Sequence, residues 1–159
     1  RLVKERPWSR WTAIALAGVL TVVNQYTIIL TIRDLLSGNI TGADVLFTAA
    51  QVWIINVIAF ALVFWELDLG GPFQRRVYNA RDTRDVDFRF PQHDGAPGNK
   101  YWEPAFFDYF YFSLSNQMAF SPTDVMPMTK RAKALMGYQA LTGFVLLALV
   151  ISRAVNILQ

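Results

Sequence analysis

The sequence contains no cysteine and only one histidine, His93, among its 159 residues. A chain without cysteine forms no disulfide, binds no zinc through thiolates and has no thiol nucleophile. His93 is the only possible base for a Ser-His-Asp triad, and the sequence has no nucleophile elbow, phosphate loop or dinucleotide motif. The carboxylates around His93 are spaced too loosely to indicate a metal site. We therefore expect a non-enzyme with no catalytic residue, metal or cofactor.

Charged residues are also scarce. They make up 17% of the chain, while hydrophobic residues make up 53% and aromatic residues 14%. A soluble domain has about a quarter of its residues charged. The charges are clustered, which leaves long uncharged runs, and the net charge of +3 is typical of basic loops that stay on the inner side of a membrane. We expect a lipid bilayer as partner and no nucleic acid.

Three of the uncharged runs are long enough to cross a bilayer: residues 12–32, 45–65 and 134–152. The first run follows a basic segment, but it is too long for a signal-peptide core and has no clear cleavage site, so we expect it to be retained. A polar loop over residues 68–104 precedes a short apolar helix over residues 105–120. The sequence predicts an all-α fold: one transmembrane domain, residues 1–159, forming an integral membrane helical bundle with three spanning helices and one short re-entrant or interfacial helix.

The short helix is too short to cross the membrane. Ala105 to Phe120 reaches about 24 Å at 1.5 Å per residue, whereas the hydrocarbon core is about 30 Å thick. A Pro-containing stretch follows, and irregular backbone survives at membrane depth only beside protein or water. This pattern favours a helix that enters the bilayer part of the way and turns back.

Polar residues inside the spans give the first candidate contacts. Asn24 lies on one helical stripe with small and polar residues: Ala13, Ala17, Thr21 and Thr31. Such a stripe joins helices by close approach and hydrogen bonds, so Asn24 is either interhelical or lines a pathway. In the second span, Gln51 and Asn56 lie about 140° apart on the helical wheel, so both cannot serve one face.

The polar loop has its own pattern. Glu66 and Asp68 are expected to return the chain to water, and Gly70-Gly71-Pro72 is expected to end the second helix. Further on, Val86, Phe88 and Phe90 alternate with charged residues, which predicts an extended segment with one apolar edge.

Two candidate motifs in the last third each leave two interpretations open. Asp108, inside the aromatic run, is either a functional ionisable group or an interfacial residue stabilised by the helix dipole. In Ser121-Pro122-Thr123-Asp124, Ser121 is either an N-cap with Asp124 as the capping-box acid, or part of a filter-like loop.

The third span carries a polar stripe. Gln139, Thr142 and Arg153 lie near this stripe, with Gly143 beside it. Arg153, at the end of the run, either extends toward the interface or lines a water-filled cavity.

This arrangement resembles the pore module of tetrameric potassium channels. Residues 107–113 resemble the pore helix, and Asp124, Pro127 and Gly143 stand where that family has its filter Asp, a later Pro and a hinge Gly. The resemblance covers roughly the last third of the chain. It implies pore-helix roles for Asp108, Asn116 and Gln117, and lining or hinge roles for Gln139, Thr142, Gly143 and Arg153. It also implies a homo-oligomer, a tetramer if the chain is a channel.

The filter itself departs from the family. The filter-like residues are Ala119, Phe120, Ser121, Pro122, Thr123 and Asp124. The family has Thr-Val-Gly-Tyr-Gly before the Asp, and its glycines permit the backbone that lines the filter with carbonyls. Pro122 instead fixes its own φ and restricts Ser121. The resemblance therefore implies a pore-like shape, and monovalent cation conduction without classical potassium selectivity.

A second resemblance covers nearly the whole chain. The sequence is similar to an uncharacterised family of bacterial multi-pass membrane proteins, which implies a bacterial plasma (inner) membrane and further spans before Arg1. The motifs that carry this resemblance are Trp65-Glu66-Leu67-Asp68, Gly70-Gly71-Pro72, Phe90-Pro91-Gln92, Ala119-Phe120-Ser121-Pro122-Thr123-Asp124 and Arg131-Ala132-Lys133.

Two hypotheses of function follow. One is an oligomeric pore or channel-like protein, and the other is a non-conducting membrane scaffold or partner-binding protein. The basic start predicts an N-terminus inside the cell, with the polar loop inside as well. A channel-like filter would require the opposite orientation, so the two lines of reasoning disagree on this point.

Overall fold

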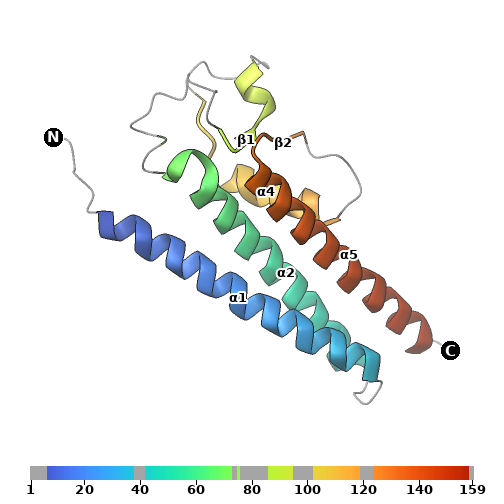
Figure 1. Ribbon diagram of the computed structural model, residues 1–159. Coiled ribbons are helices and arrows are strands. Elements are labelled where there is room, and N and C mark those ends of the chain that lie inside the picture. Colours follow the sequence, from blue (N-terminus) through green and yellow to red (C-terminus); the bar gives the residue numbers. More distant parts are fainter. Residues whose placement is uncertain are drawn as a thin grey trace.

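The computed structural model describes residues 7–37, 42–72, 75, 86–94, 102–118 and 124–157. Within them lie four α-helices: α1 (Pro7–Ser37), α2 (Gly42–Leu67), α4 (Phe106–Met118) and α5 (Lys130–Ile157). The short elements are the 3₁₀ turns η1 (Asp68–Gly70) and η3 (Pro91–Asp94) and the strands β1 (Phe88–Arg89) and β2 (Met126–Pro127). The predicted all-α fold is confirmed (Figure 1).

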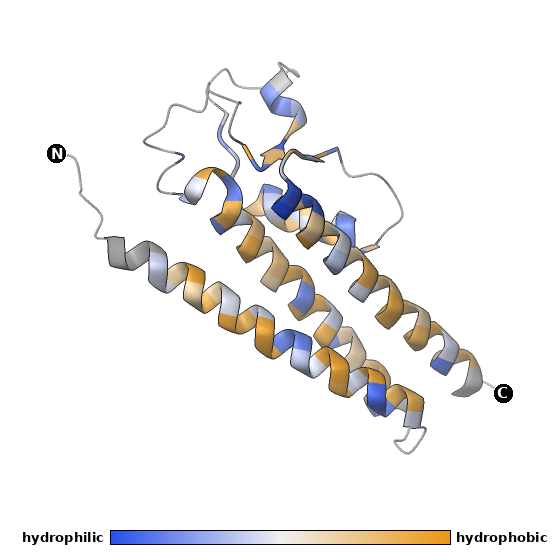
Figure 2. Cartoon of the chain, viewed as in Figure 1, coloured by the Kyte–Doolittle hydropathy of each residue, from blue (hydrophilic) through white to orange (hydrophobic). Residues whose placement is uncertain are grey.

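In the described part of the chain, three helices are long and apolar enough to cross a membrane: Trp11–Ser37, Leu46–Gly70 and Lys130–Val155. In Figure 2, most of the length of these three helices has the colour of hydrophobic residues. α1 and α5 both extend beyond the predicted spans, because a charge ends an apolar run without breaking the backbone hydrogen bonding of a helix. Arg33 and Asp34 lie in the last turns of α1, and the basic residues from Lys130 form the first turn of α5.

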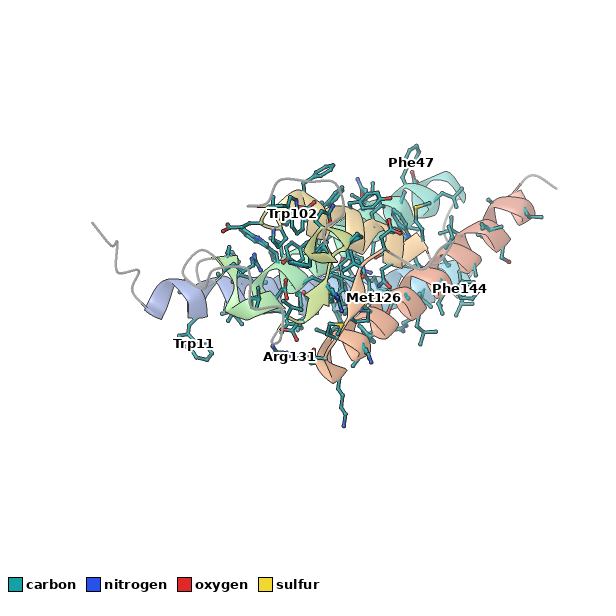
Figure 3. All side chains as sticks on the ribbon, turned by 90° about the horizontal axis from the view of Figure 1, so that it is seen from above. Trp11, Phe47, Trp102, Met126, Arg131 and Phe144 are labelled. Atoms are coloured by element: carbon teal, nitrogen blue, oxygen red, sulfur yellow. The ribbon has the colours of Figure 1, made fainter. Side chains whose placement is uncertain are left out.

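The outer surface of these helices is apolar. Val22 is 69% exposed, Phe47 73% and Phe144 59%, and Figure 3 shows Phe47 and Phe144 projecting away from the bundle. A water-soluble monomer rarely exposes apolar patches this extensive. The surface therefore fits lipid, which is the environment of a multi-pass membrane protein.

A narrow stripe of α1 faces the other helices. Ala17, Asn24 and Thr31, which the sequence places on one stripe, are buried there together with Ile28 and Leu35. The buried apolar residues of the bundle form two clusters. Ile28 and Leu35 join an aliphatic cluster with Ala49, Val52 and Leu146. At the opposite end lies an aromatic cluster of Phe60, Phe64, Phe88, Phe90, Tyr109, Phe112, Val125 and Ala132.

The predicted extended segment is confirmed over β1, where Phe88 is buried and Arg89 is exposed. Val86 and Phe90 are buried as predicted, but the alternation fails at Asp87, which is fully buried as well. β1 pairs antiparallel with β2, with Phe88 opposite Pro127. The Phe88 ring lies 5.0 Å from that of Phe64 and 5.1 Å from that of Phe112. Stacking of this kind fixes the small sheet against the end of the helical bundle.

α4 packs against both α2 and α5 (Figure 1). Its first residue, Phe106, lies 5.5 Å from the Trp65 ring, and near its end Gln117 donates to the Trp53 carbonyl. α4 therefore runs antiparallel to α2 from Trp65 to Trp53, a distance of about 18 Å along that helix. Since a hydrocarbon core is about 30 Å thick, α4 ends partway down the bundle.

Candidate functional site

The most distinctive interior feature is a network of side-chain amides centred on Asn56. Asn24 Nδ2 and Gln25 Nε2 both donate to Asn56 Oδ1, at 2.8 and 2.9 Å. Asn56 Nδ2 in turn donates to Gln117 Oε1 at 2.7 Å. One fully buried residue of α2 thus connects α1 on one side with α4 on the other.

Gln139 extends the network to α5. Its Nε2 donates to Ser113 Oγ at 2.7 Å and to Gln117 Oε1 at 3.2 Å, while its Oε1 accepts from Asn116 Nδ2 at 2.8 Å. Asn116 Nδ2 also donates to the Met136 carbonyl. All four helices therefore meet through neutral amide and hydroxyl groups, which bind each other instead of facing lipid.

A close approach at Gly143 seats the end of α4 against the middle of α5. A Cβ atom on Gly143 would lie 2.5 Å from Gln117 Cγ and 2.9 Å from the Gln117 carbonyl oxygen. No side chain fits in that space, so the glycine is what allows Gln117 to reach the network. The structure places Gly143 at this contact within a continuous helix.

The structure brings together Asn116, Gln117, Gln139 and Gly143 from the predicted site. It does not bring in Asp108, Thr142 or Arg153. Asp108 Oδ2 accepts from the Ala105 N–H at 2.7 Å, which is half of a capping box at the start of α4. Thr142 Oγ1 donates to the carbonyl of Tyr138, one turn earlier on its own helix. Arg153 is partly exposed near the far end of α5.

The filter-like segment is placed only at its last residue. Asp124 is exposed, in a bend just before β2. Ala119, Phe120, Ser121, Pro122 and Thr123 lie outside the described residues. The capping and filter interpretations of this segment therefore both stay predictions.

One prediction about the polar loop is wrong: Asp68 does not return to water. It is fully buried, and its Oδ1 accepts from the backbone N–H groups of Asp87 and Phe88 at 2.9 and 3.2 Å. Its Oδ2 accepts from the Tyr109 hydroxyl. Positive φ at Leu69 (51°), Gly70 (76°) and Gly71 (97°) turns the chain back over this carboxylate. The glycine pair was the only signal in the sequence that pointed to this reversal.

Arg75 lies over the same cluster. Its Nη1 donates to the carbonyls of Trp65 and Asp68, both at 2.8 Å, and its guanidinium is 5.0 Å from the centre of the Tyr109 ring. The residue is only 3% exposed, yet its Nη2 has no hydrogen-bond partner among the described residues. A buried guanidinium nitrogen without an acceptor is costly, because it has lost its hydrogen bonds to water and gained none in the protein.

A second buried carboxylate, Asp87, ties the loop to the start of α5. Arg131 donates to both of its carboxylate oxygens, with Nε at 2.8 Å from Oδ1. Thr129 Oγ1 adds a third bond, and the Asp87 carbonyl accepts from the Met128 N–H at 2.8 Å.

His93 belongs to the aromatic packing at the same end. Its Nδ1 accepts from the Phe90 N–H at 3.0 Å, and its ring lies 5.4 Å from that of Trp102. In the part of the chain that the structure describes, no group of three or more His, Asp or Glu is arranged to hold a metal ion.

The site is thus an interior of neutral amides shared by four helices, with two buried carboxylates at the end where α2 finishes and α5 begins. Comparisons with protein-family models, with curated proteins and with solved structures found no significant match. The two family resemblances drawn from the motifs stay predictions.

Proposed function

We propose that this chain is a subunit of an oligomeric membrane pore in which α4 acts as the pore helix. The observation that carries the proposal is the depth of α4. This helix of 13 residues begins beside Trp65 at the end of α2 and finishes with Gln117 against Gly143, in the middle of α5. If α2 and α5 span the bilayer, α4 stops near its centre.

A helix that ends at that depth has an electrostatic consequence. The C-terminal end of a helix carries unpaired carbonyls and about half a negative charge, which favours a cation nearby. Half-helix ends of this polarity coordinate cations in membrane transport proteins. The polarity of α4 therefore supports cation passage over anion passage.

The order of the elements supports the same proposal. A pore module has a span, a half-depth helix, a return segment and a second span, in that order. Here the order is α2, α4, the stretch that ends at the exposed Asp124, and α5. The sequence between α4 and Asp124 holds the hydroxyl residues Ser121 and Thr123 and contains no glycine. A pore built this way would pass monovalent cations without classical potassium selectivity.

A second candidate function is a non-conducting scaffold or partner-binding protein. The observation that favours it is the closed amide network. Asn56, Gln117 and Gln139 fill the space between α2, α4 and α5 with groups that bind each other. Any ion path must then run between subunits and not through one of them.

An ion-flux assay separates the two candidates. The purified chain is reconstituted into liposomes and monovalent cation flux is compared with that of empty liposomes. A pore predicts flux above the empty liposomes, and Asp124→Asn should reduce it because a carboxylate is lost at the return segment. Asp34→Asn, a change at an exposed residue near the far end of α1, is the matched control and should leave flux unchanged.

The outcomes are distinct. Absence of flux from every sample would reject the pore and leave the scaffold. Flux that Asp124→Asn leaves unaltered would reject the role assigned to Asp124. Mass measurement in detergent checks the assembly: the pore requires an oligomer, with four copies as the expected state, while a monomer would exclude a shared axis.

A further inference from the structure

The outward surface of α5 carries two lysines at the start of an apolar stripe. At 3.6 residues per turn, residues three or four apart follow one another down one side of a helix. On α5 these are Lys130, Lys133, Gly137, Leu141 and Phe144, and all of them are exposed. Leu141 is 64% exposed and Phe144 59%, and Figure 3 shows Phe144 projecting away from the bundle. None of the described helices covers this stripe.

The two lysines are available to an anion. Lys130 and Lys133 form no ion pair among the described residues, and the first turn of α5 has no acidic residue. Arg131 differs from them, because its guanidinium is held by the buried Asp87 carboxylate. Asp124, the exposed acid that precedes β2, pairs with neither lysine. Two positive charges therefore remain uncompensated where this span begins.

The excess of positive charge is specific to this position among the side chains that the structure describes at the ends of the spans. Near the end of α1, Arg33 is followed by Asp34, and both are exposed. The first turn of α2 contains Asp44. An anion that comes to the surface of the bilayer is therefore attracted most strongly to the start of α5.

The length of the stripe fits one leaflet of a bilayer. Lys133 and Phe144 are separated by about 17 Å at 1.5 Å per residue, and half of a 30 Å hydrocarbon core is about 15 Å. Between them Gly137 leaves open space, because a Cβ atom there would meet nothing within 4 Å. An acyl chain that follows this stripe has its headgroup at the level of the lysines.

A second copy of the chain fits the same stripe less well. In a symmetric dimer the same residues of both copies face each other, so packing through this surface would bring the lysines of the two copies together. Like charges that face each other across an interface cost free energy. The charge of the stripe therefore favours an anionic amphiphile as its occupant.

We propose that this surface of α5 binds an anionic phospholipid. The ammonium groups of Lys130 and Lys133 bind the phosphate of the headgroup, and an acyl chain lies along Gly137, Leu141 and Phe144. The lipid has a net negative charge, because a zwitterionic headgroup would bring a cation of its own toward two unpaired lysines. This site goes beyond the proposed pore and does not depend on ion conduction.

Native mass spectrometry of the full chain in detergent tests the proposal. The chain is mixed with equal amounts of dioleoyl phosphatidylglycerol, phosphatidylcholine and phosphatidylethanolamine, and the retained lipids are compared. We expect phosphatidylglycerol to be retained most. Soluble glycerophosphoglycerol, which has the headgroup without acyl chains, is added as a competitor and should not displace the lipid.

Single variants locate the binding. Lys130→Gln and Lys133→Gln should each lower the affinity for phosphatidylglycerol about fivefold, the factor expected for one cation near an anionic surface. Arg33→Gln, at an exposed position near the far end of α1, removes the same charge and is the matched control. It should retain phosphatidylglycerol as the unchanged chain does. Both lysines are exposed and their side chains make no hydrogen bond among the described residues, so the variants should fold normally.

Equal retention of the three lipids by the unchanged chain would overturn the proposal. Equal losses for Arg33→Gln and the lysine variants would do so too, because net charge alone would then explain the binding. Displacement by the soluble headgroup would reject an acyl chain along α5. A copy number that changes in the lysine variants, without any lipid preference, would assign the stripe to a second copy. Lipid binding is measured without flux, so a failure here is separate from a failure of the pore.

Discussion

Among the described residues, Asn56 alone links α1, α2 and α4 through its side-chain hydrogen bonds. Replacement by alanine removes the acceptor of Asn24 and Gln25 and the donor to Gln117. We expect Asn56→Ala to lower the free energy of unfolding by about 1–3 kcal/mol, since buried amides are left unpaired. Unfolding in mixed detergent micelles, followed by tryptophan fluorescence, measures the change.

Gln51→Ala is the matched control for this prediction. Gln51 lies on the same helix but is exposed. Its replacement should leave the unfolding midpoint unchanged. Equal losses for the two variants would contradict a network centred on Asn56.

Gly143 makes a second prediction at the residue scale. Gly143→Ala places a methyl group 2.5 Å from Gln117 Cγ and 2.9 Å from its carbonyl oxygen, so α4 must move away from α5. Overpacking of this kind costs about 1–3 kcal/mol. Gly137→Ala on the same helix meets no atom within 4 Å and should cost nothing. Thermal unfolding of the two variants compares them directly, and similar midpoints would refute the close contact.

The same residues show what sequence reasoning can predict. Helical geometry was sufficient to predict that Gln51 and Asn56 face different directions, and the structure confirms it. The sequence could not predict which one faces inward, because that depends on Gln117 and Gln139, which are distant in the chain. Asp68 was missed for a similar reason: its hydrogen-bond donors, Asp87, Phe88 and Tyr109, come from two later segments.

At the scale of elements, the link between β1 and α5 is specific. Arg131 holds the buried Asp87 carboxylate beside β1, although Arg131 itself is 61% exposed. Arg131→Gln removes both guanidinium hydrogen bonds to the carboxylate and leaves, among the described residues, the one from Thr129. We expect several-fold faster hydrogen exchange at Phe88 and Arg89, because a buried charge loses its partner. Lys133→Gln, an exposed change two residues further along α5, should leave exchange unaltered. Equal effects of the two variants would show that general surface charge is responsible.

The sequence predicted which helices exist more accurately than it predicted where they begin and end. The three apolar runs and the short aromatic helix all correspond to helices, since apolar length is the main determinant of a span. The ends differed because helices continue into charged turns, as at Arg33 and Lys130. The packing of α4 between α2 and α5 required the structure, since no local pattern specifies which neighbours a short helix chooses.

For the whole molecule, the absence of cysteine makes orientation directly measurable. Positive-inside counting places the N-terminus inside the cell, and the 86–94 segment with it. Ser37 and Gln92 are exposed at opposite ends of the described bundle. We expect Ser37→Cys to react with an impermeant maleimide on intact cells, and Gln92→Cys to react only after permeabilisation. The reverse result would establish the orientation that a channel-like filter requires.

The position of α4 also fixes the order in which the molecule can be assembled during synthesis. Asn116 has its partners, Met136 and Gln139, on a helix that the ribosome makes later. Until α5 has crossed the bilayer, the Asn116 amide lacks both of these acceptors, and burying it in lipid would be costly. We therefore expect α4 to stay at the membrane surface as an amphipathic segment until then. A nascent chain that stops before Lys130 should accordingly leave α4 accessible to protease, while the full chain protects it.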